Sequence, residues 1–129
     1  MIRASLVIIG DEILSGRTED TNLAYLAKWL GNLGIHLSEV RVVLDDEKEI
    51  IESVNTLRKK YDYVFTTGGI GPTHDDITTD SIAKAFGVET RIDDDALEKM
   101  KEFLDGKELT EPLLKMLHIP EGGELIYSP

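Results

Sequence analysis

Short apolar segments alternate with longer amphipathic segments along nearly the whole sequence. The apolar runs are typical of strands buried on both faces, and apolar residues three and four positions apart are typical of helices that cover a sheet. Strands are expected at residues 4–10, 35–44, 63–67, 88–92 and 123–128, and helices at 20–34, 45–61, 78–87, 94–106 and 111–117. The alternation predicts an α/β fold, a three-layer α/β/α sandwich with a mainly parallel sheet. Trp29 and Phe86 fall on helix faces and are expected in the core.

The composition excludes several classes of function. The chain of 129 residues is expected to form one domain with a core of its own. Its formal net charge of −11 argues against binding to nucleic acid or to an anionic membrane, and no apolar run approaches the ~20 residues of a membrane span. Because there are no cysteines, thiolate metal sites and cysteine nucleophiles are excluded. The N-terminus becomes acidic too early for a secretion signal, so a cytoplasmic location is expected.

The segment TTGGIGPTHDDITTD, residues 66–80, holds more glycine than a turn requires. Gly68, Gly69 and Gly71 allow the backbone to approach a ligand closely and to turn its amides toward it. The free N-terminal amides of the helix expected from Thr78 also suit an anion. Together these features predict a site for phosphate.

Three aspartates lie beside this anion site, although carboxylates repel phosphate. Asp75, Asp76 and Asp80 are compatible with it if a hard cation such as Mg²⁺ bridges them to the phosphate. They are also compatible with it if they accept hydrogen bonds from an NH-rich heterocycle or a ribose diol. Both interpretations predict a phosphorylated, donor-rich small molecule. The loop is neither a P-loop, which needs a lysine after the glycines, nor a dinucleotide fingerprint, because His74 stands where the last glycine would be.

Two other acidic segments, residues 10–12 and 44–46, follow the first and second expected strands. The carboxyl ends of parallel strands lie at one edge of a sheet, so the segments near residues 10, 45 and 70 are expected to meet there. Arg17 is the early cation near this edge and could reach a phosphate. The candidate ligand-binding residues are Asp11, Glu12, Ser15, Asp46, Thr67, Gly68, Gly69, Gly71 and Thr78.

Each candidate also has a purely structural interpretation. The glycines could form only a tight turn, and Asp46 could cap the helix that follows it. Asp76 could stabilise the helix that begins near Thr78 by ~1 kcal/mol through the helix dipole. His74 is more often a loop residue than a proton shuttle or metal ligand.

The motifs GDEILSGRTEDTN and TTGGIGPTHDDITTD resemble those of the MoaB/Mog family of molybdopterin-binding domains, and within it the CinA-like branch (competence-damage protein A and its relatives). The resemblance covers nearly the whole chain. It implies a molybdopterin-binding-like sandwich that often forms homo-oligomers, either dimers or trimers, with a ligand site at the Gly-Gly-x-Gly loop. The acidic residues of that site match Asp76 and, at the end of the second strand, Asp46. Family members usually continue into a Pro-Gly-x-Pro segment that helps to close the site, so the domain is expected to be truncated at its C-terminal end.

Three functions are left open. In the molybdenum-cofactor branch, the resemblance implies binding of molybdopterin in cofactor biosynthesis and, with Mg²⁺ and ATP, adenylyl transfer. In the CinA-like branch it implies a metal-dependent pyrophosphatase acting on ADP-ribose or related dinucleotides, with Asp75 or Asp76 as metal ligand or base. The third function is a non-catalytic oligomerising or regulatory module. We expect a phosphorylated pterin or nucleotide as ligand and Mg²⁺ as cofactor, while catalytic activity itself is left open.

Overall fold

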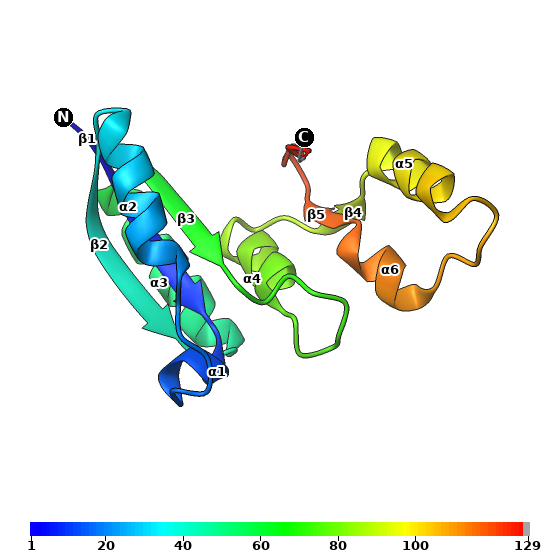
Figure 1. Cartoon of the computed structure of the whole chain (residues 1–129), viewed down its shortest axis with the longest axis horizontal. Helices are drawn as coiled ribbons and strands as arrows, with labels where there is room; N and C mark the ends of the chain where they lie inside the picture. Colours follow the sequence, from blue (N-terminus) through cyan, green and yellow to red (C-terminus); the bar gives the residue numbers. More distant parts are fainter. Residues whose placement is uncertain (128–129) are drawn as a thin grey trace.

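The computed structural model describes residues 1–127. A three-stranded sheet with its helices forms the first part of the chain, and a two-stranded sheet with two helices forms the second (Figure 1). The elements in chain order are β1 (Ile2–Ile9), α1 (Asp11–Leu14), α2 (Asn22–Asn32), β2 (Ile35–Val43), α3 (Glu47–Lys60), β3 (Tyr63–Thr67), α4 (Thr78–Ala85), β4 (Thr90–Ile92), α5 (Asp94–Leu104), α6 (Glu111–Met116) and β5 (His118–Pro120).

The central sheet has the strand order β2-β1-β3, and both pairings are parallel. The apolar run of β1 lies in the middle, and its residues from Ala4 onward are buried, as a strand flanked on both edges and covered on both faces requires. The predicted α/β fold with a mainly parallel sheet is therefore confirmed. All three strands point the same way, so their carboxyl ends share one edge.

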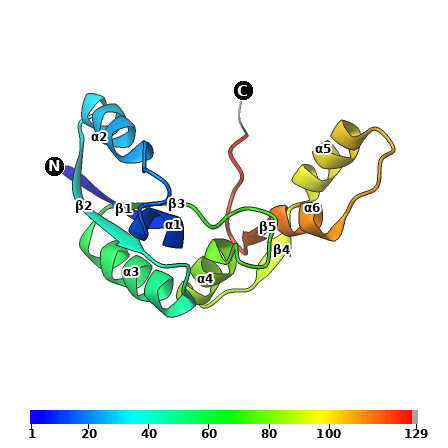
Figure 2. The same ribbon diagram turned by 60° about the horizontal axis from the view of Figure 1, so that its bottom comes forward.

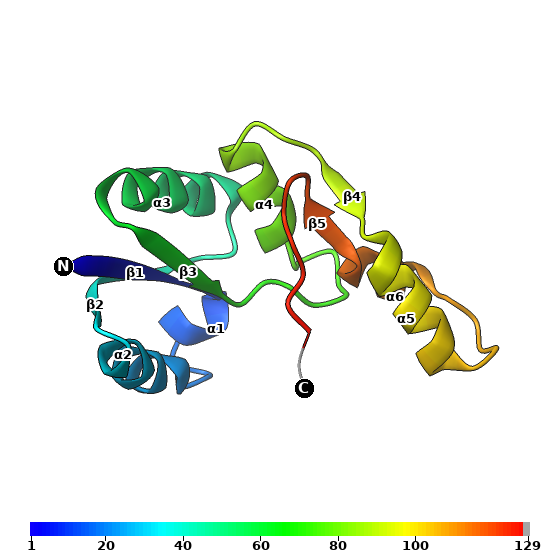
Figure 3. The same cartoon turned by 90° about the horizontal axis from the view of Figure 1, so that it is seen from above.

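Helices cover both faces of this sheet. In Figure 3, α2 lies on one side of the strands, and α3 and α4 lie on the other. On the α3 side, Val7 and Ile9 of β1 pack with Ile50, Val54 and Leu57 of α3 in the main apolar cluster. Residues two apart in β1 point to the same face, so Leu6 and Ile8 point to the face that α2 covers.

The C-terminal part differs from the sequence expectation. The strand expected at residues 88–92 is present as β4, but it pairs in antiparallel fashion with β5 and does not extend the central sheet. The strand expected at 123–128 is absent from residues 123–127, and residue 128 lies outside the described residues. Helices α5 and α6 extend away from the central sheet, with α4 between the two parts (Figures 1 and 2).

Two aromatic residues expected in the core lie at the surface. The side chains of Trp29 and Phe86 are 50% and 52% exposed. Phe86 packs instead beneath the guanidinium of Arg58, whose Cζ lies 4.4 Å from the ring centroid. The sequence also gave no signal for the one-turn helix α1. Over residues 1–127, none of the helices has both the length and the apolar character needed to cross a membrane.

Candidate functional site

The carboxyl ends of β1 and β2 are joined by a pair of reciprocal hydrogen bonds. The backbone N–H of Asp11 donates to the Asp45 carboxylate at 3.1 Å, and the backbone N–H of Asp45 donates to the Asp11 carboxylate at 2.9 Å. Beside them, the N–H of Gly10 donates to the carbonyl of Val43 at 3.0 Å. The expectation that the segments near residues 10 and 45 meet at this edge is therefore confirmed.

The glycine loop after β3 reaches the same edge and packs directly on the end of β1. At Gly68, where φ is +90°, a Cβ would lie 2.0 Å from the carbonyl oxygen of Ile9, so only glycine fits. On the other side, the buried hydroxyl of Thr78 donates to the Gly68 carbonyl at 2.8 Å, and the N–H of Thr78 donates to the Gly69 carbonyl at 3.0 Å. The loop is thus fixed between β1 and the first turn of α4.

This geometry leaves amide donors free in the loop. Across the described residues, the N–H groups of Gly69 and Ile70 donate no hydrogen bond to the protein. Both residues line the same open groove. Free backbone donors at a glycine loop form the kind of concave surface that binds anions.

Asp76 is the acidic residue held most firmly by this loop. Its carboxylate accepts hydrogen bonds from the hydroxyl of Thr73 at 2.8 Å and from the N–H of Thr73 at 3.0 Å. The hydroxyl of Thr73 is the main cause that lowers the pKa of Asp76, and the backbone of Thr73 and Gly71 adds to it. The carboxylate therefore stays ionised and keeps a fixed position at neutral pH.

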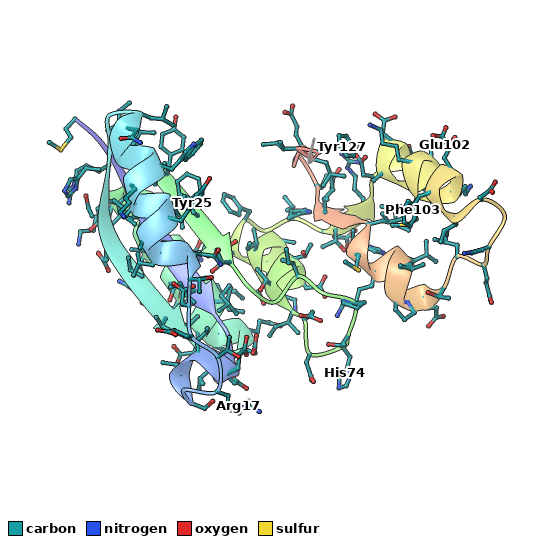
Figure 4. The ribbon with its side chains drawn as sticks, in the orientation of Figure 1. Arg17, Tyr25, His74, Glu102, Phe103 and Tyr127 are labelled. Atoms are coloured by element: carbon teal, nitrogen blue, oxygen red, sulfur yellow. The ribbon has the colours of Figure 1, made fainter. Side chains whose placement is uncertain are left out.

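A polar pocket of about 470 Å³ lies where the three segments meet. Its lining is mainly acidic and includes Asp11, Glu12, Asp45, Asp75 and Asp76. Arg17 and His74 contribute the basic groups from opposite sides of the opening (Figure 4). Donors of a phosphorylated ligand would face carboxylates here, and its anionic oxygens would face Arg17.

A larger and more apolar groove of about 620 Å³ continues from the other side of Asp76. Its walls come from the glycine loop and α4 on one side and from α6 and the segment after it on the other. Its apolar lining is Ile70, Leu114, Met116, Ile119 and Leu125. Asp76 lines both this groove and the polar pocket, so the two hollows adjoin at its carboxylate.

Comparison with known proteins assigns this chain to a protein family. Residues 5–121 match the protein family described as a probable molybdopterin binding domain. The chain belongs to this family. The finding confirms the resemblance that the glycine loop indicated.

Individual relatives agree with that assignment. A protein from Pyrococcus horikoshii is 37% identical over 96% of this chain, and a CinA-like protein from Kosmotoga olearia is 38% identical over 94%. This chain covers 52% of the first relative and 30% of the second, so it spans about half the length, or less, of these proteins.

Two solved structures bear on the fold of this molybdopterin-binding domain. The protein CinA from Thermoplasma acidophilum, of unknown function, superposes with a TM-score of 0.85 at 39% identity, over 92% of this chain and 70% of that one. The tungsten cofactor synthesizing protein MoaB from Pyrococcus furiosus superposes with a TM-score of 0.59 at 28% identity, over 65% of this chain and 52% of that one.

The candidate residues occupy different places in this domain. Asp11, Glu12, Gly69, Asp75 and Asp76 line the polar pocket, and Gly71 lines the apolar groove. Gly68 packs on β1, and Thr67 is the last residue of β3. Thr78 is buried behind the loop, with its hydroxyl used to hold Gly68. The hydroxyl of Ser15 donates to the carbonyl of Glu12 and accepts a hydrogen bond from the guanidinium of Arg17, at 3.2 and 3.1 Å.

Asp45 is the pocket residue that the sequence analysis did not select. It lines the polar pocket, whereas Asp46 stands at the exposed N-terminus of α3 without a side-chain cap hydrogen bond. The available signal was the strand period of two. Val43 is buried at the end of β2, and a residue two positions further points to the same side. Asp80 lines the apolar groove from the first turn of α4.

The acidic residues do not form a ready metal site. Within residues 1–127, no group of three or more His, Asp or Glu side chains is arranged to hold a metal ion. In Asp11, Asp45 and Asp76, one carboxylate oxygen already accepts a backbone or hydroxyl donor. Asp75 lies at the surface and pairs with His74 at 3.3 Å. The expectation that Asp75 and Asp76 bind Mg²⁺ stays a prediction.

Proposed function

We propose that this domain binds a phosphorylated pterin or nucleotide at the carboxyl edge of its parallel sheet. The observation that carries the proposal is the junction at Asp76, where a polar pocket meets a groove with apolar walls. A flat heterocycle suits the apolar walls, and the free N–H groups of Gly69 and Ile70 suit its phosphate. The carboxylates suit an NH-rich ring edge or a sugar diol. Membership of the molybdopterin-binding family supports a ligand of this class.

A divalent metal is expected to bind together with the phosphorylated ligand and not to the protein alone. Mg²⁺ usually keeps several waters and binds through one or two carboxylates together with substrate phosphates. Several acidic residues of the polar pocket already accept hydrogen bonds within the protein. They therefore suit a metal that is held jointly with the ligand better than a metal bound by the protein alone. Mg²⁺ alone should therefore stabilise the protein little, and its effect should appear when a phosphorylated ligand is added.

A second candidate function is hydrolysis of a pyrophosphate in a dinucleotide. It is favoured by the neighbouring side chains of His74 and Asp75, which are 94% and 83% exposed beside the polar pocket and are not held by the loop. The probable FAD synthase of Caenorhabditis elegans is 43% identical over 78% of this chain, although the match is only 20% of that protein. A dinucleotide ligand is compatible with that similarity.

We include self-association in the proposal. Tyr25, Trp29 and Leu33 are spaced four residues apart along α2 and its C-cap and are at least half exposed, so they form one apolar stripe. Tyr25 on α2 is labelled in Figure 4. A homo-oligomer would cover this stripe. Sedimentation equilibrium of the protein tests this part, and a monomer at all concentrations would contradict it.

The test of the binding proposal is a thermal-shift series with ATP, ADP-ribose, FAD and a pterin, each with and without Mg²⁺ or Co²⁺. A bound ligand raises the melting temperature in a concentration-dependent manner. Release of AMP or inorganic phosphate then separates hydrolysis from binding. Asp76→Asn should weaken the stabilisation by a ligand, because it removes the charge at the junction of the two hollows. If no compound in the series stabilises the protein, or if Asp76→Asn changes neither stabilisation nor turnover, the proposed site is wrong.

A further inference from the structure

The ammonium group of Lys115 on α6 is buried without a partner. Its Nζ has almost no solvent exposure, and within the described part of the chain it makes no hydrogen bond. An ammonium carries three donors, and burying its charge without acceptors is strongly unfavourable. Such a group is expected to persist only where something not belonging to the chain supplies the acceptors.

Lys115 lies where the site lacks positive charge. It lines the apolar groove and also an adjoining hollow of about 440 Å³ beside Pro72. Among the described residues that line these two hollows, it is the one lysine or arginine. The free N–H groups of Gly69 and Ile70 line the same groove from the glycine loop, whereas Lys115 enters from α6.

The neighbouring carboxylates do not use this ammonium as a partner. Lys115 contributes to the lowered pKa of Asp76, but its contribution is the smallest, and the hydroxyl of Thr73 contributes most. Asp80 and Glu111 line both hollows as well, yet neither carboxylate accepts a hydrogen bond from Nζ. The charge of Lys115 is therefore available to a ligand.

We propose that Lys115 is a ligand-binding residue whose ammonium donates hydrogen bonds to phosphate oxygens of the bound molecule. The inference rests on the proposed function and extends its site from the glycine loop across the groove to α6. A phosphate is the chemistry that fits, because charge-assisted hydrogen bonds from an ammonium and from backbone N–H groups reach it from two elements. The surrounding carboxylates repel a phosphate elsewhere in the groove, so the phosphate is expected beside the ammonium and the backbone N–H groups.

The test uses the full chain and named probes. Isothermal titration calorimetry compares ATP, ADP-ribose and FAD with their unphosphorylated counterparts adenosine and riboflavin, at low and high salt. The variants are Lys115→Met, which keeps the length of the side chain without its charge, and Lys115→Arg, which keeps the charge. Lys107→Met is the matched control, since Lys107 is exposed before α6 and lines neither hollow.

The following results support the inference together. Lys115→Met binds the phosphorylated probe at least about tenfold more weakly than the wild type, and its affinity depends less on salt. Lys115→Arg keeps part of the affinity, and Lys107→Met keeps all of it. The melting temperature of Lys115→Met without ligand stays the same or rises, because a buried unpaired charge has been removed.

Three results overturn it, and the first two are distinguishable from each other. If the wild type binds a phosphorylated probe and Lys115→Met binds it equally well, Lys115 is not a ligand-binding residue, while the proposed function stands. If the wild type binds none of the probes, the proposed function fails and this inference fails with it. Should Lys115→Met not fold, unchanged binding by the wild type between low and high salt overturns the inference on its own.

Discussion

Asp11 and Asp45 each accept a hydrogen bond from the backbone N–H of the other, at 2.9 and 3.1 Å. This reciprocal pair fixes the loop after β1 to the loop after β2. Both carboxylates line the polar pocket, so the interaction that closes the sheet edge also positions two of the acidic groups that a ligand would meet. Fold and candidate site therefore depend on the same two side chains.

Removing one half of this pair should destabilise the fold. Asp45→Ala removes the acceptor of the Asp11 N–H and should lower the free energy of unfolding by about 1–2 kcal/mol. Asp45→Asn keeps an acceptor oxygen and should cost less than half as much. Urea denaturation measures both. Asp46→Ala is the matched control, because Asp46 makes no side-chain cap hydrogen bond at the start of α3. A loss at Asp46 equal to that at Asp45 would show that acidic residues here only cap the helix.

Substitution of Gly68 should be much more harmful than substitution of a glycine in open space. In Gly68→Ala, the new Cβ would lie 2.0 Å from the Ile9 carbonyl oxygen, in addition to the left-handed backbone. We expect a loss of at least about 3 kcal/mol, the sum of backbone strain and overpacking. Gly106→Ala is the control, since Gly106 has a φ of +86° but nothing within 4 Å of its Cβ. It should lose only about 1–2 kcal/mol, the cost of the left-handed backbone.

Thermal unfolding of the two variants compares them directly. The difference between their melting temperatures isolates the close approach of the loop to β1, because both glycines have a left-handed backbone. Equal melting temperatures would mean that the loop moves away from β1 without cost. In that case, the close approach of Gly68 to Ile9 would not contribute to stability.

The central sheet was predictable because its signals are local. The unbroken apolar run of β1 and the glycines that end α2 and α4 define strands and helices without reference to distant residues. The parallel arrangement then follows from the alternation. In that topology the three loops after the strands meet at one edge of the sheet. The proximity of Asp11 to the glycine loop could therefore be predicted from the sequence.

Other features depended on contacts that a sequence does not reveal. Whether Asp45 or Asp46 faces the pocket depends on where the alternation of side chains ends after β2, and the sequence does not fix that point to within one residue. The partner of β4 is the three-residue strand β5, which has too few residues for a periodic pattern. Trp29 is half exposed, and the buried residue of α2 is its neighbour Leu30. Lys115 carries no sequence signal of its own, since the burial of its Nζ is a property of the folded chain only.

Glu39 should make stability depend on pH in the acid range. Its carboxylate accepts a hydrogen bond from the Tyr61 hydroxyl at 2.8 Å, and Arg41 and Lys60 pair with it at 3.0 and 3.1 Å. The Tyr61 hydrogen bond is the largest of the causes that lower the pKa of Glu39 from 4.5 to about 2. Since the pKa is lower in the folded state, the stabilisation is complete above pH 4.5 and is lost as the pH falls toward 2.

Glu39→Gln tests this dependence. At neutral pH the variant should melt at a lower temperature than the wild type, and the difference should shrink as the pH is lowered through that window. Glu98→Gln on the exposed face of α5 is the control, and its difference from the wild type should not change in the same way. A difference between Glu39→Gln and the wild type that stays constant from pH 5 down to pH 2 would contradict the assignment.

Thr73 should control the ionisation of Asp76. Thr73→Val removes the hydroxyl that donates to Asp76 at 2.8 Å and leaves the N–H donor at 3.0 Å in place. Because the hydroxyl is the main cause of the lowered pKa, the pKa of Asp76 should rise toward 3.8 in the variant. Because the pKa is lower in the folded state, Asp76 contributes to stability above pH 3.8, and this contribution is lost as the pH falls below 3.8. Thr73→Val reduces it.

An NMR titration of the Asp76 side-chain carboxyl carbon measures this shift directly. Thr73→Ser, which keeps a hydroxyl at the same position, is the matched control and should titrate close to the wild type. In the thermal-shift series, Thr73→Val should also weaken stabilisation by a phosphorylated ligand, because the Asp76 carboxylate then has more freedom at the junction of the two hollows. If Thr73→Val titrates like Thr73→Ser, the hydroxyl does not hold Asp76, and the fixed acidic group on which the proposed site depends must be held by the backbone alone.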